Sequence, residues 1–303
     1  MRIAVGIDFS PESELAARQA VDIARHSGGE VVLVHVAGTV ELPAPGPRSD
    51  PSLQAAMEAY RATISRSVAR ARHQLEELRE RLSGQGPVIS QVLAEGFPDS
   101  GLCSAAREMA ADLILVGTHG RTGLRWFFLG SVAQEVVRAS TTDVLVARRE
   151  QAARGGYRRI LVAMDFSPPS ERALDRALEL AAPGAAVDVV HFYHLPAIVG
   201  MDGMAYGFGP LEASLADDLQ AEGEKLLAAR RRSSGPILRF HVMHTAAIPG
   251  VVHWLEGQPF DLAALGSHGR RGFRRAILGS VAETVVRRAP CSVLIARGGS
   301  AAG

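Results

Sequence analysis

The chain has 303 residues, of which 47% are hydrophobic, so each of two domains of about 150 residues can bury a full core. A formal net charge of +1 argues against a nucleic-acid-binding protein, and no apolar run is long enough to span a bilayer. The two cysteines form no CxxC pair, and a strand-like run occupies the N-terminus where a signal peptide would lie. We therefore expect a cytoplasmic protein with reduced thiols that acts on neither nucleic acid nor membrane.

Apolar strands and amphipathic helices alternate along the first half of the chain. The first strand is short, too apolar for a surface helix, and ends at Asp8, which predicts a buried parallel strand. The predicted elements that follow are a helix at 11–27, a strand at 30–36, a helix at 52–83, a strand at 87–94, a helix at 98–110, a strand at 112–117, a helix at 131–140 and a strand at 142–148.

The second half repeats this order. We predict a strand at 159–165, a helix at 168–182, a strand at 186–192, a helix at 211–233, a strand at 236–243, a helix at 247–257, a strand at 260–266, a helix at 280–289 and a strand at 291–296. Such alternation is typical of parallel sheets with helices on both faces and right-handed crossovers. The apolar, glycine-rich connection 195–210 is either a lid or partner surface, or a loop packed on its own domain.

One glycine-rich loop occurs twice. Gly117-Thr118-His119-Gly120 precedes Gly130-Ser131, and Gly266-Ser267-His268-Gly269 precedes Gly279-Ser280 at the same spacing. Each loop joins a strand to a helix, so free N–H groups and the helix dipole can hold phosphate. The only lysine, Lys225, lies outside both loops, which excludes a P-loop nucleotide triphosphatase.

An Asp-Phe-Ser-Pro sequence also occurs twice, beginning at Asp8 and Asp165. Each aspartate ends the first strand of its half. In open parallel sheets, ligands bind beyond the carboxyl ends of the strands where the strand order reverses. The alternative is a helix-capping role, but Ser10 and Ser167 lie nearer the helix starts.

Taken together, these motifs resemble the universal stress protein family, with one family domain in each half at 1–150 and 156–297. The resemblance rests on the two glycine motifs, on the aspartate after each first strand and on His35-Val36 at the end of the second strand. It implies two Rossmann-like (adenine nucleotide alpha hydrolase-like) α/β domains, each a five-stranded parallel sheet in 3-2-1-4-5 order. It also implies ATP binding, with Mg²⁺ as an optional companion, because members with an intact glycine motif bind ATP.

The resemblance assigns roles to particular residues. Asp8 and Asp165 would contact the ribose end of ATP, and the backbone at Val36 would read the adenine edge. Phe192 stands at the position of Val36 in the second half, and its larger side chain would narrow the adenine pocket or stack there. The residues expected to line the phosphates are Gly117, Gly120, Gly130, Ser131, Val132, Gly266, Gly269, Gly279, Ser280 and Val281.

Several polar residues near the loops have more than one interpretation. His119 and His268 have no nucleophile or carboxylate beside them, which favours loop ordering or phosphate hydrogen bonding over acid–base catalysis. Arg121 and Arg270 are either phosphate clamps or part of a solvated face. Four histidines at strand ends offer only a weak zinc motif, since no carboxylate accompanies them: His191, His194, His241 and His244.

We therefore expect an ATP-binding stress sensor or regulator without fast turnover. A slow ATPase is the first alternative, and an interaction module with vestigial nucleotide sites is the second. The apolar last strands, 143–147 and 292–296, are expected to pair the two halves within one chain, because exposed edges of this kind invite pairing. Homodimerisation of whole chains through the remaining surfaces is left open.

Overall fold

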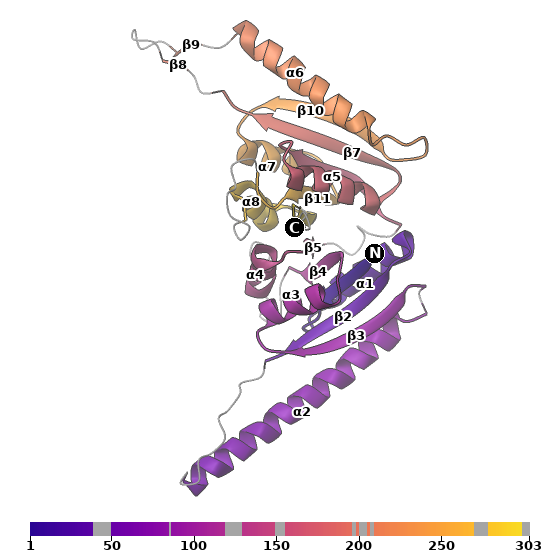
Figure 1. The fold of residues 1–303 in the computed structure, drawn as a ribbon, viewed down its shortest axis with the longest axis vertical. Coiled ribbons are helices and arrows are strands. Elements are labelled where there is room, and N and C mark those ends of the chain that lie inside the picture. Colours follow the sequence, from indigo (N-terminus) through magenta and orange to yellow (C-terminus); the bar gives the residue numbers. More distant parts are fainter. Residues whose placement is uncertain are drawn as a thin grey trace.

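A computed structural model describes residues 1–38, 50–84, 86–118, 129–148, 155–195, 198–199, 205–206, 209–269 and 278–298. Its two halves repeat the same succession of strands and helices (Figure 1). The first half contains β1 (Arg2–Gly6), α1 (Pro11–Ser27), β2 (Glu30–Ala37), α2 (Pro51–Leu82), β3 (Val88–Glu95), α3 (Pro98–Glu108), β4 (Leu113–Gly117), α4 (Ser131–Ala139) and β5 (Asp143–Ala147).

The second half contains the equivalent elements and one additional short hairpin, β8–β9. Its elements are β6 (Tyr157–Met164), α5 (Pro168–Leu180), β7 (Ala181–Tyr193), β8 (Ile198–Val199), β9 (Ala205–Tyr206), α6 (Gly209–Ala228), β10 (Ile237–His244), α7 (Ala247–Gly257), β11 (Leu262–Gly266), α8 (Ser280–Arg288) and β12 (Ser292–Ala296). In the described parts of the chain, no helix is both long enough and apolar enough to cross a membrane.

The largest differences from the predicted boundaries in the second half are at the α5–β7 junction and at the end of α6. Helix α5 ends at Leu180 and β7 begins at once, because Pro183 cannot continue a helix and Gly184 adopts a left-handed φ of 71°. The register between β6 and β7 shifts beside this turn, between Tyr157 and Arg159. Helix α6 ends at Ala228, earlier than predicted, and a turn follows in which the N–H groups of Arg230 and Arg231 both bond to the carbonyl of Leu227.

The strands form one ten-stranded sheet in the order β10-β7-β6-β11-β12-β5-β4-β1-β2-β3. Strands within each half are parallel, and in each half the order by position in the chain is third, second, first, fourth, fifth. The halves join at β5 and β12, which run antiparallel with Leu145 opposite Leu294. The predicted pairing of the last strands is therefore confirmed, and we call this junction the seam.

Each face of the sheet carries one hydrophobic core that continues across the seam. Helices α1, α2, α5 and α6 cover one face, where Leu75, Leu174 and Leu227 are buried. Helices α3, α4, α7 and α8 cover the other face, where Val136, Val251 and Val285 are buried. The shared cores and the shared sheet make the two halves one packed molecule.

Helix α2 extends well beyond the body of the first half (Figure 1). Its C-terminal turns are buried through Leu75, Leu78 and Leu82. The side chains from 52 to 70 are exposed or half-exposed, and Leu53 is 52% exposed. The N-terminal turns of α2 therefore project without packing against the rest of the described chain.

Candidate functional site

The first half contains a pocket of about 370 Å³ at the carboxyl ends of β1, β2 and β4. Strands β1 and β4 are neighbours, so the residues that end them meet at one edge of the sheet. The pocket is lined by Gly6, Ile7, Asp8, Ser13, Val34, His35, Val36, Pro98, Leu102, Val116, Gly117, Thr118, Gly130, Ser131, Val132 and Ala133. All the predicted site residues of this half that the structure describes lie in this one pocket.

Asp8 organises the start of α1. Its Oδ1 accepts hydrogen bonds from the backbone N–H of Ser10 at 3.0 Å and from the Ser10 hydroxyl at 2.5 Å. Ser10 in turn caps the helix by accepting from the N–H of Ser13. Phe9 between them has a left-handed φ of 64°, a conformation that a non-glycine residue adopts only where the surroundings hold it. Asp8 thus has a structural role in positioning the cap and also borders the pocket.

Asp165 repeats this arrangement in the second half. Its Oδ1 accepts from the N–H and the hydroxyl of Ser167, at 3.1 and 2.5 Å. Phe166 has a φ of 58°. The structure therefore shows a helix-cap role for both aspartates and places each of them at the carboxyl edge of the sheet.

Helix α4 presents an uncapped N-terminus to the pocket. Its N-cap residue is Gly130, which has no side chain to bond to the first N–H groups, and Ser131 and Val132 at its start line the pocket. Gly279 is likewise the N-cap residue of α8, which begins at Ser280. Helices α1 and α5, on the opposite face, are capped by serines. Free N–H groups and the helix dipole make the N-terminus of α4 an attractive place for an anion.

Matching hydrogen bonds join the described residues on either side of each glycine loop. The N–H of Gly130 bonds to the carbonyl of Thr118 at 2.7 Å, and the N–H of Gly279 bonds to the carbonyl of Ser267 at 2.7 Å. These bonds bring the strand end and the helix start together in each half. The predicted residues His119, Gly120, Arg121 and Arg270 lie outside the described residues.

In the second half, Gly269 lies close to the carboxylate of Asp165. A Cβ placed on Gly269 would be 2.5 Å from Asp165 Oδ2. His268 Nδ1 lies 3.0 Å from the hydroxyl of Ser267. Asp165 follows β6, and Gly269 lies in the glycine loop that follows β11. Because β6 and β11 are neighbouring strands, these two predicted site residues lie close together.

Val36 and Phe192 occupy equivalent places and both pack against a glycine of the next helix. A Cβ on Gly101 in α3 would meet Val36 at 2.7 Å, and a Cβ on Gly250 in α7 would meet the ring of Phe192 at 2.5 Å. The ring of Phe192 therefore lies on the backbone of α7. This contact places the larger side chain in the core of that face, where Phe192 is partly buried.

His35 and His191 were not predicted as site residues, although the repeat contains both. Their Nδ1 atoms lie 2.7 Å from the carbonyl of Ile7 and 2.8 Å from the carbonyl of Met164. Because a carbonyl only accepts, each Nδ1 carries a hydrogen and donates it to that carbonyl. A histidine recurs near the end of the second strand of each half, in β2 and β7. This repetition in the sequence could have pointed to His35 and His191.

The strand-end histidines have partners other than a metal. His241 Nε2 lies 2.9 Å from Asp188 Oδ1, and His244 forms an ion pair with Glu212. His244 also stacks on Tyr193, with 4.9 Å between ring centroids. Among the described residues, no three His, Cys, Asp or Glu side chains are placed to hold a metal ion together.

Residues 1–148 and residues 156–297 each match the universal stress protein family. The chain belongs to this family. A universal stress protein of Mycolicibacterium smegmatis is 29% identical over 97% of this chain and 96% of its own length. A universal stress protein of Mycobacterium tuberculosis is also 29% identical, over 97% of this chain and 94% of its own length.

Solved structures of the family have the same fold. The crystal structure of a universal stress protein from Archaeoglobus fulgidus covers 98% of this chain and 98% of its own length, with a TM-score of 0.70 and 20% identity. A putative universal stress protein from Pseudomonas aeruginosa covers 98% of this chain and 92% of its own, with a TM-score of 0.63 and 18% identity. This universal stress protein therefore has an α/β fold with both family domains in one chain.

Proposed function

We propose that this universal stress protein binds ATP at the carboxyl edge of the sheet in each half and acts as a nucleotide-dependent regulator. The observation that carries the proposal is the first-half pocket, in which Asp8, the strand-ending Gly117 and the uncapped start of α4 face one space of about 370 Å³. This volume falls within the usual range for small-molecule sites, about 300–1,000 Å³. A near-neutral chain also favours a small ligand over nucleic acid, and we expect it to act in the cytoplasm.

Each group in the pocket would meet a different part of the nucleotide. Asp8 would accept from the ribose hydroxyls, and the backbone at Val36 would bind the adenine edge. The phosphates, with Mg²⁺ if it accompanies them, would lie against the N-terminus of α4. The proposed phosphate residues are Gly117, His119, Gly120, Arg121, Gly130, Ser131 and Val132 in the first half, with Gly266, His268, Gly269, Arg270, Gly279, Ser280 and Val281 in the second, where Asp165 and Phe192 complete the site.

The pocket supports binding more than catalysis. Its described lining contains one carboxylate, Asp8, and one imidazole, His35, and both already hold bonds within the fold. Fast hydrolysis needs a water positioned by a base and an electrophile that stabilises the transferring phosphate. A slow ATPase and an interaction module with vestigial sites are the alternatives, and turnover by the purified protein tests the first of these.

The direct test uses calorimetry to measure how many ATP molecules bind per chain. It compares the wild type with variants that carry an added negative charge at the start of α4 or α8. Ser131→Glu places a carboxylate where the phosphates would lie, yet a negative charge at a helix N-terminus leaves the fold intact. Ser280→Glu does the same in the second half, so each variant is the matched control of the other.

We expect about two ATP per wild-type chain, about one in either single variant and none in the double variant. Mass spectrometry of small molecules released on denaturation would show which nucleotide the purified protein carries. Wild-type stoichiometry in a folded double variant would contradict the phosphate assignment, and a wild-type value of one would show that a single half binds.

A further inference from the structure

The seam contains a charge cluster that involves both halves. Asp143, at the start of β5, is fully buried. Its carboxylate accepts from Arg172 Nε at 3.0 and 3.1 Å, from Arg176 Nε at 3.2 Å and from the backbone N–H of Arg297 at 2.8 Å. All three arginines belong to the second half. Within the described residues, the hydrogen bonds to this carboxylate of the first half come from the second half, and two of its donors are guanidinium groups.

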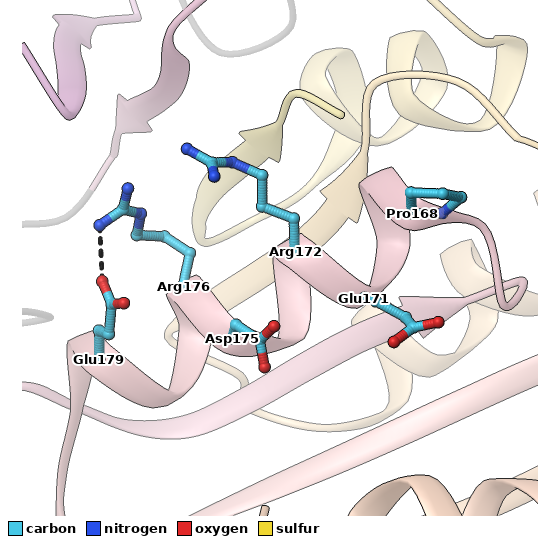
Figure 2. A pocket seen from close by; sticks show the side chains of 6 residues that line it. All are labelled: Pro168, Glu171, Arg172, Asp175, Arg176 and Glu179. Atoms are coloured by element: carbon cyan, nitrogen blue, oxygen red, sulfur yellow. Dashed lines mark hydrogen bonds and ion pairs between the residues drawn. The ribbon is translucent and has the colours of Figure 1, made fainter. Parts of the chain in front are cut away.

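Two of these arginines extend from the same side of α5. Figure 2 shows Arg172 and Arg176 one turn apart on that helix, with Arg176 also joined to Glu179. The side chain of Arg176 is 11% exposed, so this partner is itself nearly buried. The carboxylate of Asp143 raises the pKa of Arg172, which keeps the guanidinium charged. The cluster is a charged contact at the seam that is buried at Asp143 and Arg176 and partly exposed at Arg172.

Aligning the two halves identifies an equivalent contact on the other side of the seam. The residues of that second contact are uncharged. Because Ala147 aligns with Ala296 and Asp8 with Asp165, the counterparts of Asp143, Arg172 and Arg176 are Ser292, Leu15 and Gln19. The hydroxyl of Ser292 accepts from the backbone N–H of Arg148 at 3.2 Å. Gln19 accepts from the buried hydroxyl of Tyr157 at 3.4 Å. All three charged positions of one contact are thus neutral in the other.

We propose that this asymmetry makes the seam selective, so that the β5 edge of a first half accepts a second half and rejects another first half. Two first halves joined in this geometry would place each Asp143 against Leu15 and Gln19. Two second halves would place Arg172 and Arg176 against Ser292. A pair of first halves therefore buries each Asp143 carboxylate without a cation, which is strongly unfavourable. A pair of second halves leaves Arg172 and Arg176 without a carboxylate across the seam, although Arg176 keeps Glu179 and Arg172 is partly exposed. The partner that this surface fits is the unlike half of the same chain.

Variants of the full chain can reproduce each mismatched contact without separating the halves. Asp143→Ser leaves two arginines opposite a serine, as in a pair of second halves. Arg172→Leu with Arg176→Gln leaves the carboxylate opposite Leu and Gln, as in a pair of first halves. Combining all three substitutions copies the neutral contact. Arg230→Gln is the control, since Arg230 pairs with Asp175 and Glu171 within one half.

Thermal unfolding followed by circular dichroism gives the readout. We expect the double arginine variant to lower the Tm by about 10 °C, because it leaves the buried Asp143 carboxylate without a cation. Asp143→Ser should lower the Tm by less, because Arg176 keeps Glu179 and Arg172 is partly exposed. The triple variant should recover to within about 3 °C of the wild type, and Arg230→Gln should give a smaller loss that adds to that of Asp143→Ser. If a mismatched variant does not fold, folding of the triple variant supports the proposal. A triple variant no more stable than the mismatched ones, or an unchanged Tm in Asp143→Ser, would overturn it.

Discussion

Asp188 is a buried carboxylate outside the proposed nucleotide sites. It lies on β7 with 6% of its surface exposed and accepts from His241 Nε2 at 2.9 Å on the neighbouring strand β10. The hydrogen bond from His241 holds the pKa of Asp188 below its usual range, and the charge of Arg239 acts in the same direction. This hydrogen bond links β10, the edge strand of the second half, to the neighbouring strand β7.

Asp188→Asn should lower the free energy of unfolding at pH 7 by about 2 kcal/mol, the typical value for a hydrogen bond to a charged group. Because the pKa is lowered in the folded state, the contribution is present above the unfolded pKa of about 4 and is lost as the pH falls through the folded pKa. The difference between variant and wild type should therefore shrink below pH 4. Urea unfolding from pH 3 to 7 measures this.

Asp22→Asn is the control, since the pair of Asp22 with Arg25 lies on the surface of α1. Its loss should be below about 1 kcal/mol at every pH. An equal loss in both variants at pH 7 would contradict the role given to Asp188.

At the level of residues, the motifs that occur in both halves made part of the pocket lining predictable. Asp8, Gly117 and Gly130 stand in motifs that occur twice, and the pocket contains all three. Pro98 and Leu102 also line it, but they come from α3, and their place depends on how that helix packs across β2. No pattern within the sequence of α3 indicates that packing. The charged contact at Asp143 was missed for the same reason, because its partners lie in the other half.

Helix α2 combines a buried and a projecting segment. The apolar stripe of Leu75, Leu78 and Leu82 in its core-packed turns continues toward the N-terminus through Met57 and Ile64. Helical segments without tertiary packing are only marginally stable in water, because most helix stability in proteins comes from a packed apolar face.

Amide hydrogen exchange should therefore be fast in the projecting segment of α2 and slow in its packed segment. We expect amides of residues 54–66 to exchange at least about 100-fold faster than those of residues 71–82, as unpacked segments open with little free energy. Peptide-resolved mass spectrometry measures this, with α1, which is buried along one face, as the internal control. Uniform protection along α2 would show instead that another surface covers its N-terminal turns in solution.

Most elements could be predicted because their hydrophobic periods are clear and proline, serine or glycine marks their starts. Pro11 and Pro168 follow capping serines, and α1 and α5 begin where predicted. The early start of β7 was missed because Ala181 and Ala182 suit a helix. Pro183 disfavours helix in the residue before it, and Ala181 pairs with Tyr157 of β6. The early end of α6 was missed because alanine and arginine also favour helix.

At the scale of the whole molecule, the seam should make the two halves unfold together. Leu145 and Leu294 face each other across it and are fully buried. Replacing either with alanine should cost about 2–5 kcal/mol. Because both cores cross the seam, we expect calorimetry to show one transition that moves to lower temperature in Leu145→Ala and in Leu294→Ala.

Leu53→Ala is the matched control, since this exposed leucine lies on the projecting part of α2 and its loss should leave the transition within about 1 °C of the wild type. Two separate transitions, of which only one moves in each seam variant, would contradict the view that the halves form one cooperative unit.

Helices α4 and α8 also connect the halves, through their last turns. The nine-residue α4 begins at the pocket with Ser131, and near its end the carbonyl of Val137 accepts from the guanidinium of Arg297, which follows β12. In α8 the carbonyl of Val286 accepts from Arg148, which follows β5. Each helix is thus a short rod that starts at the carboxyl edge of the sheet in its own half and is hydrogen-bonded near its last turn to the other half. A phosphate that drew either rod along its axis would pull on an arginine beside the opposite half's last strand.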